Sequence, residues 1–118
     1  MGAVMPPIPL SLLPDSMEVR VPVDSDYGGE YAEAVTVEHV RFDGSMAMVR
    51  KGYVLSDGSK GLVYVDAANS TGATDGEGGF VAPVGSIVKI GGEELSVVKV
   101  VPCPGFFGAV HHWEIEVA

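Results

Sequence analysis

The chain has 118 residues, a formal net charge of −9, 47% hydrophobic residues and one cysteine. This length accommodates one domain with a modest core, and the hydrophobic content excludes a disordered chain. A single cysteine excludes an internal disulfide framework and a zinc site built from several cysteines. The acidic balance counts against a protein that grips nucleic acid, because phosphate binding requires a basic surface.

The arrangement of glycine, proline and valine along the chain indicates the fold class. Short valine-rich runs are separated by Gly and Pro, and this alternation predicts an all-β fold. We expect a small single-domain β-barrel of about six strands, with long projecting loops. The expected organisation is an extended Pro-rich arm over residues 1–15 and one barrel domain over residues 16–118.

The arm is the first predicted element. Residues 6–14 read Pro-Pro-Ile-Pro-Leu-Ser-Leu-Leu-Pro, and proline favours extended geometry in the residue before it. The sequence therefore predicts an extended segment with at most one helical turn. Such an arm packs either across its own domain or against a neighbouring chain, so Ile8 and Leu10 are candidate subunit-interface residues.

A strand is predicted over residues 16–23, where Met17, Val19, Val21 and Val23 alternate with polar positions. These four side chains are expected to face the core. Residues 24–30 follow as an acidic, turn-rich loop.

The next strand is predicted over residues 33–42. Its apolar positions change parity between Val37 and Val40, which predicts a β-bulge near His39. Residues 43–61 are bracketed by the turn dipeptides Asp43-Gly44 and Asp57-Gly58 and have an apolar interior with a basic centre. They are expected to form a projecting hairpin or an ordered loop.

The second half of the chain continues the strand pattern. A strand is predicted over residues 61–67, and the Gly-rich stretch 69–79 is expected to be a flexible surface loop. Strands over 86–90 and 94–101 flank Gly91-Gly92, which predicts a tight hairpin.

The last strand is predicted over residues 111–117, after a Pro/Gly connection. Trp113, Ile115 and Val117 are expected to face the core, and His112, Glu114 and Glu116 the solvent.

No catalytic, cofactor or metal site is predicted. The run Asp24-x-Asp26-x-Gly28-x-Glu30 lacks the ligand positions of an EF-hand loop and is interpreted as a solvated turn. Adjacent strand residues alternate between the two faces, so His111 and His112 are expected to point apart and not to chelate one ion together. The cysteine, Cys103, lies between two prolines and is interpreted as a small hydrophobic residue. We therefore expect a protein that is not an enzyme.

Six segments carry a resemblance to a known family. In chain order they are Pro7-Ile-Pro-x-x-Leu12-Leu13, Asp26-Tyr-Gly-Gly29 with Tyr31-Ala-Glu-Ala-Val35, Val37-x-x-Val40-Arg41, Tyr64-Val-Asp66-Ala67-x-Asn69-Ser70, Val88-x-Ile90-Gly-Gly-x-Glu94-Leu and Val110-His-His-Trp-Glu-Ile-Glu-Val117. In this order, over nearly the whole chain, they resemble minor capsid proteins of tailed phages and prophages of Gram-positive bacteria. Those proteins are similar to the head-completion, or stopper, proteins of long-tailed phages.

The resemblance implies a barrel protomer that joins a ring below the portal and adaptor. Such a ring retains packaged DNA, docks the tail and has a loop that gates the channel. Residues 43–61 are our candidate for that loop, with residues 69–83 as the competitor. The candidate gating residues are Met46, Met48, Val49, Arg50 and Lys51. The two cations either contact DNA phosphates or pair with an acidic neighbour in the ring, and we favour the neighbour.

The same resemblance implies the partners and the location. The expected partners are the portal or adaptor ring, tail-completion proteins, further copies of the chain and packaged double-stranded DNA bound without sequence specificity. No membrane is expected, and the location is the host cytoplasm during assembly and then the virion. Candidate interface residues in the acidic loop are Asp24, Asp26, Tyr27 and Glu30.

Two alternatives remain open at this point. The chain could be a tail-completion or adaptor connector protein, although adaptors are mainly helical. It could instead be a small binding module with an OB-like or SH3-like barrel, but the net charge argues against the version that binds nucleic acid.

Overall fold

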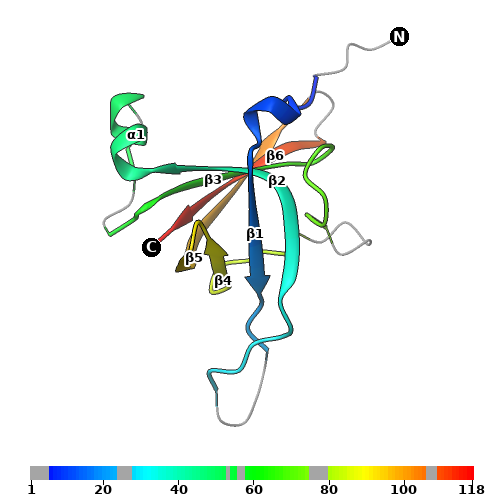
Figure 1. The fold of residues 1–118 in the computed structure, drawn as a ribbon, viewed down its shortest axis with the longest axis vertical. Helices are drawn as coiled ribbons and strands as arrows, with labels where there is room; N and C mark the ends of the chain where they lie inside the picture. The colour runs from blue at the N-terminus through cyan, green and yellow to red at the C-terminus, as the bar shows by residue number, and fades with distance from the viewer. Residues whose placement is uncertain (1–5, 24–27, 53, 56–57, 75–79, 106–108) are drawn as a thin grey trace.

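Six antiparallel strands form a closed barrel (Figure 1). The computed structural model describes residues 6–23, 28–52, 54–55, 58–74, 80–105 and 109–118. The strands follow one another around the barrel in the order β1-β2-β3-β6-β5-β4, and β4 pairs with β1 to close it. Closure pairs both edges of every described strand, which removes the free sheet edges that promote aggregation. The all-β barrel expected from the sequence is confirmed.

The element bounds are β1 (Asp15–Arg20), β2 (Val35–Gly44), β3 (Gly61–Asp66), β4 (Ile87–Ile90), β5 (Glu93–Pro104) and β6 (Val110–Val117). A 3-10 helix, η1 (Leu10–Leu12), precedes β1, and a short α-helix, α1 (Ser45–Arg50), follows β2. Neither of these helices is long and apolar enough to cross a membrane.

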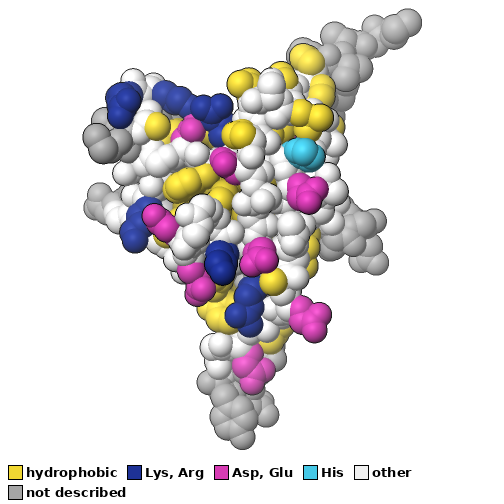
Figure 2. Space-filling view, in the orientation of Figure 1, with side chains coloured by type: hydrophobic (Ala, Val, Ile, Leu, Met, Phe, Trp, Pro, Cys, Tyr) yellow, Lys and Arg dark blue, Asp and Glu magenta, His cyan; other side chains and the backbone are white. Residues whose placement is uncertain are grey.

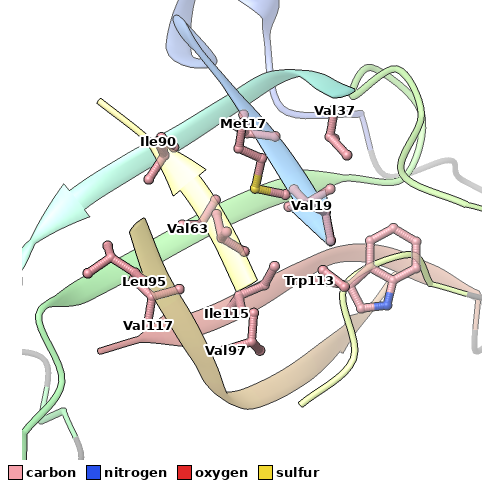
Figure 3. Packing of buried hydrophobic residues seen from close by; sticks show 14 of the residues in the cluster. Met17, Val19, Val37, Val63, Ile90, Leu95, Val97, Trp113, Ile115 and Val117 are labelled. Atoms are coloured by element: carbon pink, nitrogen blue, oxygen red, sulfur yellow. The ribbon is translucent and has the colours of Figure 1, made fainter. Parts of the chain in front are cut away.

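The core fills the inside of the barrel with side chains from all six strands (Figure 3). The period-two prediction for the last strand is confirmed, because Trp113, Ile115 and Val117 are all buried in β6. The Trp113 ring stacks on Phe80 with the ring centroids 4.5 Å apart. The chain end is therefore a structural part of the barrel wall, paired with β3 on one side and β5 on the other.

The bulge predicted near His39 is present in β2. Asp15 pairs with Val40 and Ser16 pairs with Glu38, so His39 is the extra residue. Its φ of 60° is the left-handed value that bulges and turns use. The extra residue lets Val37 and Val40 both face the core although they are three positions apart.

The first strand is shorter than predicted. It ends at Arg20, and Val23 is 42% exposed, so the expectation that Val23 faces the core is wrong. Pro22 has no N–H to donate to a sheet ladder. The chain stays paired beyond the strand through a bridge between Pro22 and Tyr31, but this pairing runs outside the barrel. It forms the base of the β1–β2 connection at the lower end of Figure 1.

Residues 45–50 form the helix α1 instead of the hairpin or ordered loop expected over residues 43–61. Asp43 and Gly44 still belong to β2, and the helix α1 follows directly, so the turn expected at Asp43-Gly44 is wrong. The backbone N–H of Ser45 donates to the carbonyl of Lys60, and Gly44 pairs with Gly61. The helix α1 therefore lies in the connection between β2 and β3, next to the paired ends of these two strands.

The other two predicted local features are confirmed. Gly91 and Gly92 have φ values of 60° and 81°, as the tight turn between β4 and β5 requires. In its described part, from residue 6 onward, the arm is extended apart from the single turn of η1, as its prolines predict. Residues 69–79 are expected from the sequence to form a flexible surface loop. Part of this stretch packs against the barrel instead, since Ser70 and Ala73 are buried.

Glu116 departs from the predicted pattern of β6. The alternation places it on the wet face, but it is only 2% exposed. The hydroxyl of Ser59 donates to its Oε1 at 2.9 Å, and Lys99 Nζ lies 3.8 Å from its Oε2. These partners come from a connection and from β5, so the strand pattern alone could not indicate that this carboxylate is covered.

Candidate assembly surface

The arm is held against its own barrel by Asp66 at the end of β3. The backbone N–H of Ile8 donates to Asp66 Oδ1 at 3.0 Å, and the side-chain amide of Asn69 donates to the Ile8 carbonyl at 2.7 Å. Leu13, where the arm meets β1, is 1% exposed. Residues 6–13 therefore pack in cis.

The outer side of the arm keeps an apolar surface. Leu10 and Leu12 are 53% and 48% exposed, and Ile8 is half-buried. Figure 2 shows hydrophobic side chains gathered over the arm. Two exposed leucines on a short segment can contact a neighbouring protein.

An ion-paired carboxylate, Asp43, anchors two cations beside α1. Arg41 Nε lies 3.1 Å from Asp43 Oδ1, and Lys51 Nζ lies 2.6 Å from Asp43 Oδ2. Burial raises the pKa of the Asp43 carboxyl, but hydrogen bonds and charge from Lys51 and Arg41 outweigh it and hold the pKa below its usual value. The cations are therefore fixed in place while much of each side chain stays exposed.

Tyr64 connects this ion cluster to α1. Lys51 Nζ lies 5.8 Å from the centre of the Tyr64 ring, within the range of a cation–π contact. The Tyr64 hydroxyl contacts Met48 Sδ at 3.8 Å, and burial raises the Tyr64 pKa. Met48 has no exposed surface. This methionine packs α1 onto the barrel.

A groove of about 300 Å³ lies between the arm and α1. Its lining combines apolar side chains of the arm with an aromatic ring and a cation of the barrel wall and a second cation just after α1. These residues are Ile8, Leu12, Leu13, Tyr64, Arg41 and Lys51. Figure 2 shows Lys and Arg side chains gathered beside α1. We call this groove and the exposed face of α1 the arm–helix surface.

The predicted site residues separate into two regions. Ile8 and Lys51 line the groove, and Arg50 is exposed at the end of α1. Glu30 is exposed in the β1–β2 connection, which lies at the opposite end of the long axis from the arm and α1 (Figure 1). Asp24, Asp26 and Tyr27, and the side chains of Met46 and Val49, lie outside the described part of the structure.

Sequence reasoning missed the residues that organise the arm–helix surface. Arg41 and Asp43 share one face of β2, and this i, i+2 spacing was a usable signal for the ion pair. Tyr64 lies opposite Arg41 because of the pairing register between β2 and β3, which no local pattern specifies.

A second polar cluster was also missed, on β5 and β6. Cys103 Sγ lies 3.3 Å from Glu114 Oε2, and a ring nitrogen of His112 lies close to both. Burial, followed by the hydrogen bond and charge of Glu114, raises the pKa of Cys103 to about 11. Burial lowers the pKa of His112. Both groups are therefore neutral near pH 7.

Comparison with known proteins decides the family. A family model described as "Minor capsid protein" matches residues 9–117. The chain belongs to this minor capsid protein family. No curated protein and no solved structure matches it.

Membership agrees with the resemblance that the sequence motifs indicated. A minor capsid protein has a structural role in a phage particle, so its partners are other proteins of the virion and its location is the virion. A structural family suggests that the chain is not an enzyme.

Proposed function

We propose that this minor capsid protein is a head-completion, or stopper, subunit. Copies of the chain would form a ring below the portal and adaptor that retains packaged DNA and docks the tail. The observation that carries the proposal is a closed barrel with unlike surfaces at its two ends. One end has the arm–helix surface, and the other has the connection that contains exposed Glu30.

Unlike surfaces suit a ring, because a contact between two different patches of one chain repeats until the rotation closes. Arg50 is exposed at one end and Glu30 at the other, so opposite charges are available to such a contact. The closed barrel supplies no free strand edge for pairing among the described strands, and contacts then fall to the arm, α1 and the connection.

The net charge supports a channel that lets DNA move. A ring multiplies the charge of −9 carried by each copy, and like charges repel within a Debye length of about 8–10 Å. A wall of this sign would let DNA pass without adhering to it. Arg50 and Lys51 would then serve contacts between subunits, while Met48, which is buried, would support α1 from behind.

The fold favours the stopper over a mainly helical adaptor. An adaptor would be mainly helical, whereas α1 has six residues and all other long described elements are strands. A solitary OB-like or SH3-like binding module is disfavoured by the family match, which covers residues 9–117.

Assembly without this subunit tests the proposal. We expect DNA-filled heads that leak their genome and tails that stay unattached, as seen by electron microscopy and nuclease protection. Supplying the intact chain should restore infectious particles. Empty heads with packaging blocked, or normal particles, would contradict the proposal.

A matched pair of variants tests whether the arm–helix surface takes part in assembly. Arg50→Gln removes a charge from the arm–helix surface, and Lys89→Gln removes the charge of an exposed residue of β4. We expect Arg50→Gln to restore few particles and Lys89→Gln to restore as many as the intact chain. If both variants restored the same number of infectious particles, Arg50 would not take part in the contact between subunits. The stopper role would then be tested only by assembly without the subunit.

A further inference from the structure

Three potential metal ligands of different chemistry meet on the outer face of the barrel. Cys103 on β5 is the direct cross-strand partner of His112 on β6, and Glu114 lies two residues further along β6. Cross-strand partners and residues at i, i+2 share one face of a sheet. The pairing register therefore brings a thiol, an imidazole and a carboxylate to one place.

The distances are close to those of a tetrahedral metal site. One ligand atom from each of the three residues lies within 4.8 Å of the others, and Cys103 Sγ is 3.3 Å from Glu114 Oε2. Zinc bonds of about 2.0–2.3 Å at tetrahedral angles separate neighbouring ligand atoms by roughly 3.3–3.6 Å. Small side-chain rotations would close the difference, and all three residues are half-buried rather than locked in the core.

A hydrogen-bond chain sets the tautomer of His112. His111 Nε2 lies 2.6 Å from the carbonyl oxygen of Pro6, which can only accept, so Nε2 carries the proton. A His111 ring that carries its proton on Nε2 alone accepts at Nδ1, and in that tautomer His112 Nδ1, 2.8 Å away, donates to it. This leaves the lone pair of His112 Nε2 free.

This arrangement matches the support that metal-binding histidines receive. A histidine ligand commonly donates its other ring N–H to a neighbouring acceptor, which fixes the ring and strengthens the ligand. Here His111 is that acceptor, and it links the cluster to the arm through Pro6.

We propose that Cys103, His112 and Glu114 bind one Zn²⁺ ion, with water as the fourth ligand. Thiolate, imidazole and carboxylate are the three ligand types that zinc uses in proteins. The ion would join β5 to β6 beside the arm. The proposal stands on this cluster alone and does not depend on the stopper role.

Cobalt and zinc titrations of the full-length, metal-free protein test the proposal. We expect Co²⁺ to give the intense visible bands of a tetrahedral site and a thiolate-to-cobalt charge-transfer band in the near ultraviolet. One equivalent of Zn²⁺ should remove both signals and raise the melting temperature. Mg²⁺ should do neither, because it prefers oxygen ligands in octahedral geometry.

Variants separate a built site from incidental binding. Cys103→Ser should abolish the charge-transfer band and weaken Zn²⁺ binding at least about 10-fold, since losing a ligand costs no less than losing an outer-shell partner. Glu114→Gln should weaken binding similarly and serves as the second variant if Cys103→Ser fails to fold. The matched control is His39→Asn, which removes an exposed imidazole from β2 and keeps a residue that tolerates positive φ.

The results that would overturn the proposal are equally specific. They are the absence of binding, a pale octahedral Co²⁺ spectrum, or Zn²⁺ affinity that is unchanged in both Cys103→Ser and Glu114→Gln. Any of these would leave the cluster as a thiol hydrogen-bonded to a carboxylate.

Discussion

Replacing Asp66 with alanine is expected to lower the free energy of unfolding by about 3–4 kcal/mol. The Asp66 carboxylate is fully buried and accepts backbone N–H bonds from Ile8, Ala68 and Asn69 at 3.0, 3.0 and 2.7 Å. Alanine leaves all three donors without this acceptor and releases the arm from the end of β3. Urea denaturation followed by tryptophan fluorescence measures the loss.

A surface carboxylate provides the control for this change. Glu93 is exposed at the start of β5, and Glu93→Ala should change stability by no more than about 0.5 kcal/mol. Limited proteolysis should also cleave the arm faster in Asp66→Ala than in Glu93→Ala. Similar stability and cleavage rates in the two variants would show that Asp66 does not hold the arm.

Replacing Gly72 with alanine is expected to cost about 3 kcal/mol, although this residue is exposed. Its φ of +84° is in the left-handed region, and an added Cβ would lie 2.6 Å from the backbone carbonyl oxygen of Thr36. Residues 70–74 are tied to β2 through paired hydrogen bonds between Thr71 and Glu38. The loop therefore cannot move away without breaking these bonds.

A substitution at Gly92 separates the two causes of the stability loss expected for Gly72→Ala, namely the positive φ and the clash of the added Cβ with Thr36. The φ of Gly92 is +81°, nearly the same as that of Gly72, but an added Cβ would have no heavy atom within 4 Å. Gly92→Ala should therefore cost only the conformational term, about 1 kcal/mol. Thermal or urea unfolding of both variants gives the comparison. Equal losses would mean that the loop is not packed against Thr36 as the structure has it.

Much of the fold could be predicted from residues that act locally. Alternation around Trp113 and Ile115 requires a strand with one dry face, and adjacent glycines at 91 and 92 allow the positive φ values of a tight turn. The bulge at His39 could be predicted because the parity of the apolar residues changes there, and one extra residue returns Val40 to the core.

The features that sequence reasoning missed depend on contacts between distant segments. Glu116 is buried because Ser59 and Lys99 reach it from other parts of the chain. The arm–helix surface depends on the register that sets Tyr64 opposite Arg41. Cys103 and His112 meet only because β5 pairs with β6, and this pairing cannot be inferred from the spacing of residues within one strand.

The position of this chain in the mature particle tests the central claim most directly. Electron cryomicroscopy of phage particles that contain it should show the six-stranded barrel repeated as a closed ring between the portal vertex and the tail. The arm–helix surface of each copy should face the β1–β2 connection of the next. Copies spread over the faces of the capsid shell, with none at the junction, would contradict the stopper role.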